Sequence, residues 1–225
     1  YSEIVGDFGD SSISGSGFFR TDFFPGAKLN VVDTLLKGDP DQIVLTEISE
    51  SGQRRTFTRG EVRKLANQVA SSLLKAGVEE GDVVAACVAN TADVVSFALG
   101  ALKIGAIFSS TSADFGAATV LDRFQQISPK VLLVTTDYGY NGKEIDCLEK
   151  ISEIVAGLPT LVKVVSIGSK PNPYLSFDNW LSATDGSEEI SVKGSFSRPG
   201  FILFSSGTTG KPKCIVHSAA GVLLK

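Results

Sequence analysis

A short polar segment near residue 205 holds a dense group of side chains suited to binding phosphate. It follows an apolar run at 200–204 and combines hydroxyls, glycines and lysines. Glycines let a backbone approach a ligand and turn its N–H groups inward. Hydroxyls supply short donors, and lysines neutralise charge. We predict a loop that binds a polyphosphate, the alternative being an ordinary polar surface turn, and the loop residues are Ser205, Ser206, Gly207, Thr208, Thr209, Gly210, Lys211 and Lys213.

This segment does not fit the P-loop of nucleoside triphosphatases. That motif is G-x-x-x-x-G-K followed by Ser or Thr, whose hydroxyl holds magnesium. Here the glycines are three positions apart and Pro212 follows Lys211. Proline supplies neither a hydroxyl nor a backbone N–H. The P-loop interpretation is therefore excluded.

The elements that must position the loop alternate along the chain. Apolar runs predict strands at 83–89, 106–109, 131–135, 161–167 and 200–204. Helical spacing predicts helices from about 59 to 76 and over 92–104, 117–127 and 143–156. Thr58 and Glu61 form a capping box, Thr91 can cap the second helix, and residues 42–58 suggest a hairpin. Strands alternating with helices predict an α/β fold with a largely parallel sheet.

Composition narrows the class of protein. Of 225 residues, 43% are hydrophobic and 20% charged, which is a globular balance. The net charge of −4 and the interspersed charges argue against nucleic acid as a partner. The apolar stretch 83–108 is interrupted by polar residues, so it predicts core elements and no membrane span. The three cysteines are far apart, which favours a reducing, cytoplasmic location.

Residues 205–213 closely resemble the phosphate-binding signature of the adenylate-forming enzymes, [ST]-S-G-T-T-G-x-P-K-G. The match departs at Cys214, where glycine is usual and where the acetoacetyl-CoA synthetase subfamily often carries cysteine before V-H-S. Phe108 and Ala113 depart from that subfamily, which otherwise resembles this chain at 24–30, 105–110, 114–116, 121–124 and 140–144.

The resemblance implies an acid–CoA ligase that uses ATP, Mg²⁺ and CoA with a small carboxylate. The carboxylate would attack the α-phosphate of ATP, and the CoA thiol would then displace AMP. By resemblance, Ser206, Thr208, Thr209 and Lys211 would contact the β- and γ-phosphates. No residue of this chain is assigned as a metal ligand or as catalytic, since the catalytic residues are expected beyond residue 225. Acetoacetate is the predicted acid, and acetyl- or propionyl-CoA synthesis is the alternative.

Three other residues have two interpretations each. Lys143 lies near the predicted carboxyl end of a strand, where α/β sheets bind ligands, and the corresponding loop of acetyl-CoA synthetases approaches the CoA phosphates. A solvated lysine that opens a helix is the alternative. His217, the only histidine, is expected to pack rather than to catalyse, and Trp180 is expected to be a packing anchor.

The predicted organisation has two parts. Residues 1–17, rich in glycine and serine, form a flexible arm. Residues 18–225 form a partial large N-terminal domain of an acyl-CoA synthetase that ends after the phosphate-binding loop, and the small C-terminal domain is absent. A truncated remnant that only binds nucleotide or a partner is a hypothesis of a different class, and the oligomeric state is left open.

Overall fold

The computed structural model describes residues 3–17, 21–205 and 210–224, and its centre is a seven-stranded sheet. The strand order is β13-β12-β9-β7-β8-β14-β15, in which only β15 runs antiparallel to its neighbour. This arrangement confirms the predicted α/β class. The strands are β7 (Val83–Val88), β8 (Ile107–Ser112), β9 (Val131–Thr135), β12 (Lys163–Ile167), β13 (Leu175–Ser176), β14 (Pro199–Ser205) and β15 (Lys213–Ser218).

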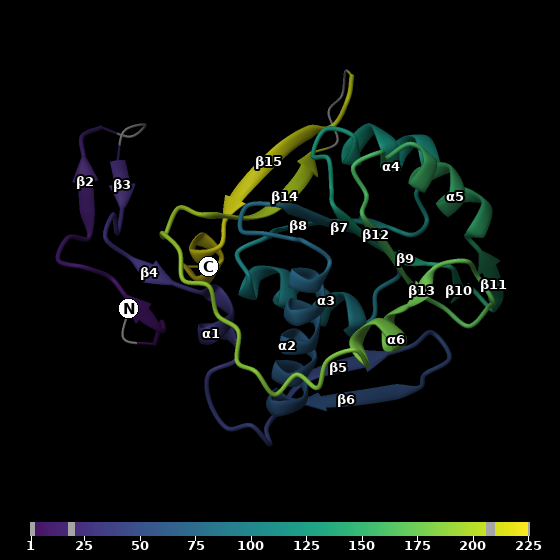
Figure 1. Ribbon diagram of the computed structural model, residues 1–225, viewed down its shortest axis with the longest axis horizontal. Helices are drawn as coiled ribbons and strands as arrows, with labels where there is room; N and C mark the ends of the chain where they lie inside the picture. Colours follow the sequence, from purple (N-terminus) through teal and green to yellow (C-terminus); the bar gives the residue numbers. More distant parts are fainter. Residues whose placement is uncertain (1–2, 18–20, 206–209, 225) are drawn as a thin grey trace.

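Helices cover both faces of this sheet (Figure 1). Side chains alternate along a strand, so Val84 packs into one core and Ala85 into another. Gly100 lets the two central helices of the first layer approach, because a Cβ there would lie 2.4 Å from a methyl group of Val69. The first layer is α2 (Arg59–Lys75), α3 (Ala92–Lys103) and α6 (Phe177–Leu181), and the second is α4 (Ala117–Phe124) and α5 (Leu148–Ala156).

The predicted hairpin and capping box are confirmed. Strands β5 (Ile43–Ile48) and β6 (Arg54–Thr58) pair antiparallel, and Thr58 and Glu61 each accept the other's backbone N–H at the start of α2. Thr91 is the N-cap residue of α3, as predicted, but its hydroxyl makes no cap hydrogen bond and is buried without a partner in the described part of the chain. A carboxylate takes its place: Glu47 Oε2 accepts the N–H of Ala92 at 2.7 Å.

The predicted helix 143–156 is wrong in its first third. Strand β11 (Lys143–Asp146) pairs with β10 (Asp137–Tyr140), and α5 begins only at Leu148. The turn between them is Asn141-Gly142, with φ of 51° and 69°. This dipeptide favours a tight hairpin turn because both residues tolerate the left-handed conformation. The apolar spacing predicted a helix too early, and the turn signal decides the local structure.

The N-terminal segment is not featureless. Strands β1 (Gly6–Asp7) and β4 (Lys28–Leu29) pair, as do β2 (Ile13–Gly15) and β3 (Thr21–Phe23). Phe8 packs edge-on against Phe24 with ring centroids 5.4 Å apart. Helix α1 (Val31–Leu35) follows, and a 3₁₀ turn (Ala220–Leu224) ends the described chain. The division into an arm and a partial domain stays a prediction.

An irregular strap over residues 182–198 returns the chain to β14. The Lys103 side chain is 1% exposed and forms an ion pair with Glu189 of the strap. Trp180, just before the strap, is 5% exposed and packs against Phe97 and Phe177, which confirms it as a packing anchor. None of the helices in the described ranges is long and apolar enough to cross a membrane.

Candidate functional site

The sheet reverses its strand order at β7. Strand β8 lies on one side of β7, and the next strand of the sheet in the chain, β9, lies on the other side. The loops that leave neighbouring strands then diverge at the carboxyl edge, which creates a crevice where α/β proteins bind ligands. The topology therefore selects the loops after β7, β8 and β9 as the walls of a candidate site.

A cavity of about 590 Å³ occupies this place. Its size is in the range of small-molecule sites. We call it the edge crevice, and four segments line it: the β5–β6 tip (Glu47, Ile48, Ser49, Glu50), the loop after β7 (Ala89, Asn90, Thr91), the end of β8 and its loop (Ser112, Ala113, Asp114), and β10 (Tyr138, Gly139, Tyr140).

Hydrogen bonds fix the inner walls of the edge crevice. The N–H of Ala89 donates to Thr135 Oγ1 at 2.9 Å, which ties the end of β7 to the end of β9. The Lys150 ammonium donates to the carbonyl of Ala113 in the loop after β8. Burial raises the pKa of the Tyr138 phenol on the third wall. The walls are therefore shaped by contacts within the described chain.

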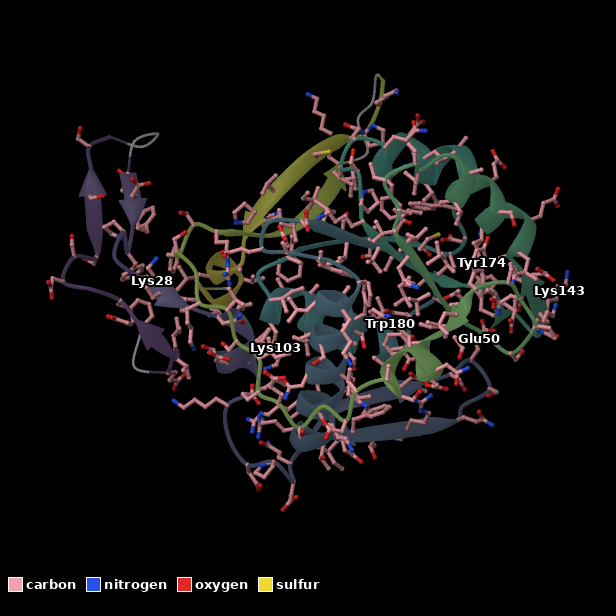
Figure 2. All side chains as sticks on the ribbon, viewed as in Figure 1. Lys28, Glu50, Lys103, Lys143, Tyr174 and Trp180 are labelled. Atoms are coloured by element: carbon pink, nitrogen blue, oxygen red, sulfur yellow. The ribbon has the colours of Figure 1, made fainter. Side chains whose placement is uncertain are left out.

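Two hairpin tips meet at the mouth of the crevice. Glu50, at the tip of β5–β6, accepts the N–H of Asn141 at 2.6 Å through Oε2. Asn141 opens the turn that leads to Lys143, and Figure 2 shows Glu50 and Lys143 at the same end of the molecule. Both residues line a second cavity of about 460 Å³. A fixed carboxylate thus stands beside a predicted phosphate-facing lysine.

Lys143 therefore lies near the edge crevice, but on a different secondary-structure element from the one predicted. It is exposed at the start of β11, and it opens a strand instead of a helix. Its cavity also contains Ser49, Ser51 and Glu144. The described cavity places an ammonium group where an anionic part of a ligand in the edge crevice can reach it. CoA binding by Lys143 stays a prediction.

Asp137 holds together two loops at the carboxyl edge. Its carboxylate accepts the N–H groups of Ser169 and Lys170 and the hydroxyls of Ser169 and Thr136. Burial by itself would raise the pKa of Asp137, but these hydrogen bonds outweigh it and the pKa is lowered. The carboxylate form is therefore the one that ties the end of β9 to the loop after β12.

The phosphate-loop segment connects β14 and β15 at the edge of the sheet. Ser205 and Lys213 are the last paired residues on either side, and Gly210 has a φ of 105°, a conformation that favours glycine. Lys211 and Lys213 are exposed. The predicted residues Ser206, Gly207, Thr208 and Thr209 lie outside the described residues. None of the described loop residues Ser205, Gly210, Lys211 and Lys213 lines either cavity above.

The remaining candidates have simpler surroundings. His217 is half-buried on β15 opposite Phe201. Cys87 and Cys147 are buried, whereas Cys214 is exposed. The residues that the structure describes contain no group of three or more His, Cys, Asp or Glu side chains placed to hold a metal ion.

Sequence reasoning missed Glu47 and Glu50. Glu47 and Glu50 sit in a hairpin that was predicted, but their partners Ala92 and Asn141 are about 45 and 91 positions away along the chain. The N-G dipeptide at 141–142 was the signal that could have predicted the second hairpin tip. No sequence signal indicates which tip faces which.

Comparison with protein families gives one match that covers most of the chain. The family model described as AMP-binding enzyme matches residues 33–224. The acetoacetyl-CoA synthetase of Rattus norvegicus is 39% identical over 219 residues, covering 91% of this chain and 33% of the rat protein. The acetoacetyl-coenzyme A synthetase of Rhizobium meliloti is 34% identical over 99% of this chain and 36% of its own length. The chain thus spans about a third of the curated relatives it matches.

Solved structures agree with this match. An acetoacetyl-CoA synthetase from Streptomyces lividans superposes with a TM-score of 0.89 at 33% identity, covering 98% of this chain and 35% of that one. An anthranilate CoA ligase in complex with anthranoyl-AMP superposes with a TM-score of 0.73 at 28% identity, over 86% of this chain and 35% of its own. The fold is therefore that of the N-terminal third of these proteins.

Proposed function

The chain belongs to the family of AMP-binding enzymes, and we propose that it supplies the phosphate-binding loop and the CoA-facing crevice of an acetoacetate–CoA ligase. Because the chain spans about a third of its relatives, the activity is proposed for a protein of their length. The products are acetoacetyl-CoA, AMP and pyrophosphate. A cytoplasmic location belongs to the same proposal.

One observation supports this function most. The signature at 205–213 follows β14, a strand of the sheet that runs parallel to β8. The loop therefore leaves the carboxyl edge of the sheet, the edge where α/β folds bind ligands. A polar surface turn would require neither this order of glycines, hydroxyls and lysines nor this position.

The first half-reaction is proposed to use the loop for charge stabilisation. An acetoacetate oxygen attacks the α-phosphorus of ATP, the bond from that phosphorus to the bridging oxygen breaks, and pyrophosphate leaves with the bond's electron pair. Negative charge grows on the leaving group, and preorganised donors stabilise such charge in the transition state. Lys211 and Lys213 flank Pro212 on the described side of the loop. Magnesium enters with ATP as part of the substrate.

The second half-reaction is proposed to use the edge crevice. The CoA thiolate attacks the acyl carbon of the adenylate, AMP leaves, and the thiol proton passes to solvent. We assign the nucleotide part of CoA to the edge crevice, with Lys143 facing its phosphates. What supports this assignment is the cavity at the β7 switch point and the ammonium of Lys143 beside it.

The choice of acid is tested by steady-state kinetics. A protein extended to the relatives' length is assayed with acetoacetate, acetate and propionate, and kcat/KM is compared. We expect acetoacetate to give the highest value. A clear preference for acetate or propionate would favour the alternative short-chain synthetases and contradict the acid named here, while leaving the ligase class intact.

A binding role without catalysis is the second candidate, and the share of the relatives' length that is present favours it for the 225-residue chain alone. Pyrophosphate exchange with ATP and acetoacetate separates the two. We expect exchange from the extended protein and none from the 225-residue chain. Exchange catalysed by the short chain would show that it contains all the groups that adenylation needs.

A further inference from the structure

The strand that leaves the phosphate loop is held by one glutamine of the second helical layer. Gln126 lies two positions after α4 ends, and its side-chain Nε2 donates to the carbonyl of Pro212 at 3.1 Å. The same nitrogen donates to the carbonyl of Asp122 at 2.6 Å. Its Oε1 accepts from the Cys214 thiol, with sulfur and oxygen 3.6 Å apart. Figure 1 shows α4 beside the end of β14 and the start of β15.

The chemistry of the partners fixes the orientation of the amide. Pro212 and Asp122 both present carbonyl oxygens, which only accept, so the NH₂ group of Gln126 must face them. The amide oxygen then faces Cys214, whose thiol is a weak donor. Each polar group of the side chain is therefore used. Glycine, the usual residue at position 214 of the signature, has no side chain that could make the third contact.

Besides Gln126, the described part of the hairpin near the loop is supported by Phe204, which is half-buried and packs against the core beneath the second helical layer. Strand β14 pairs with β8 through a single register pair, Phe201 with Phe108. Further along, Leu203 and Ile215 lie opposite each other and are 48% and 45% exposed. A bond to the carbonyl of Pro212 fixes the backbone between the two lysines of the loop. This position is where a small displacement would misdirect both ammonium groups.

We propose that Gln126 is a positioning residue for the phosphate loop and that Cys214 is its partner on β15. The inference rests on the proposed function for its effect on ATP. The hydrogen bonds of Gln126 to Pro212 and Cys214, here called the tie, are a property of the chain itself. Loss of the amide keeps both lysines in the sequence but lets the backbone around Pro212 that carries them move. ATP affinity then falls, and binding in the edge crevice does not change.

The reactivity of the Cys214 thiol reports whether the tie is formed. It is the exposed cysteine of the chain, since Cys87 and Cys147 are buried. Alkylation of the native 225-residue chain by iodoacetamide, followed by mass spectrometry of the modified peptide, therefore measures Cys214. Gln126→Ala is compared with Gln125→Ala, the neighbouring glutamine, whose amide bonds to the carbonyl of Gly157 and not to the hairpin.

We expect Gln126→Ala to speed alkylation of Cys214 and to raise the Kd of Mg·ATP, each about threefold to tenfold, the effect of losing one or two modest hydrogen bonds. Gln125→Ala should change neither value by as much as twofold, and CoA affinity should be equal in all three proteins. Cys214→Ser keeps a donor and should retain wild-type ATP affinity, whereas Cys214→Ala should weaken ATP binding slightly.

The possible outcomes test the tie and the proposed function separately. If ATP binds wild type and Gln126→Ala equally, the positioning role is overturned and the phosphate site stands. If ATP neither binds wild type nor protects Cys214, the proposed function fails for this chain, and faster alkylation of Gln126→Ala would still support the tie. Equal alkylation rates in wild type and Gln126→Ala would overturn the tie itself.

Discussion

The two candidate ligand regions are built in opposite ways. The edge crevice rests on β7 and β9, whose side chains are buried on both faces of the sheet, for example Val84 and Val134. The phosphate-loop hairpin stands at the sheet edge, where Val216 of β15 is 56% exposed and Ile215 is 45% exposed. Successive strand residues point to opposite faces, so the middle of β15 has an exposed apolar side chain on each face.

This difference indicates which of the two regions the 225-residue chain stabilises by its own contacts. Strands with apolar residues on both faces are typical of the interior of a parallel sheet. The crevice satisfies that rule with contacts inside the described chain, whereas β15, at the sheet edge, leaves the apolar side chains of Ile215 and Val216 exposed. We therefore expect the crevice to be preformed in the 225-residue chain and the hairpin to gain support in proteins of the relatives' length.

The largest expected effect compares the same substitution in the two regions. Val134→Ala on β9 removes two buried methyl groups and should lower the free energy of unfolding by about 2–3 kcal/mol. Val216→Ala on β15 removes the same atoms from a side chain that is 56% exposed and should cost less than about 0.5 kcal/mol. Urea unfolding of the 225-residue chain measures both values.

The comparison would break if the two valines behaved alike. An equal cost for Val216→Ala would mean that β15 is covered in solution, for instance by a second copy of the chain. Sedimentation at several protein concentrations would then detect the association. Such a result would contradict the description of β15 as an exposed strand.

Lys211→Ala tests the hairpin as a phosphate site. In a protein of the relatives' length, loss of a charge-assisted contact to the leaving pyrophosphate should slow adenylation about ten- to a hundredfold. The thioester-forming step, started from acetoacetyl-adenylate, should change far less because pyrophosphate has already left. Single-turnover assays of the two half-reactions measure this split, and equal losses in both would show a general structural defect instead.

Much of the fold could be predicted from sequence because its signals are local. The capping box at Thr58 and Glu61 and the apolar strands at 83–89 and 131–135 each depend on neighbouring residues. The helix predicted at 143–156 failed because its apolar spacing continued across a turn that Asn141 and Gly142 impose. The cap hydrogen bond predicted for Thr91 is absent, and Glu47, distant in the sequence, accepts the N–H of Ala92 instead.

The candidate site likewise has one part that local sequence signals predict and one part that they do not. The phosphate loop could be predicted because its residues are consecutive. The edge crevice could not, since its walls come from four segments that only the strand order brings together. The partners of Glu50 and Gln126 are likewise set by how hairpins and α4 pack, and no periodicity or motif encodes that packing.

Lys143→Ala tests the crevice as the CoA site, with a smaller effect expected. An exposed ammonium facing a phosphate contributes modestly, so the Kd of CoA for the 225-residue chain should rise about threefold to tenfold. Lys163→Ala is the matched control, because Lys163 is exposed at the start of β12, on the opposite edge of the sheet. Calorimetric titration measures both. Equal affinities in all three proteins would remove Lys143 from the site.

The smallest expected effect concerns the carboxylate at the mouth of the crevice. Glu50 accepts the N–H of Asn141 at 2.6 Å and shares a cavity with Lys143. A CoA phosphate that approaches Lys143 meets this negative charge at short range, and like charges near a surface repel by a modest amount that salt reduces. Glu50→Gln keeps the size of the side chain and removes the charge.

Glu50→Gln should therefore tighten CoA binding about twofold to fivefold at low salt, and the gain should shrink as salt is added. Glu188→Gln, at an exposed position of the strap, makes the same change in net charge away from the crevice and should leave the Kd unchanged. If Glu50 instead served mainly to hold the two hairpin tips together, Glu50→Gln would weaken CoA binding at every salt concentration. The sign of the change thus decides whether the Glu50 carboxylate mainly repels the CoA phosphates or mainly holds the two hairpin tips together.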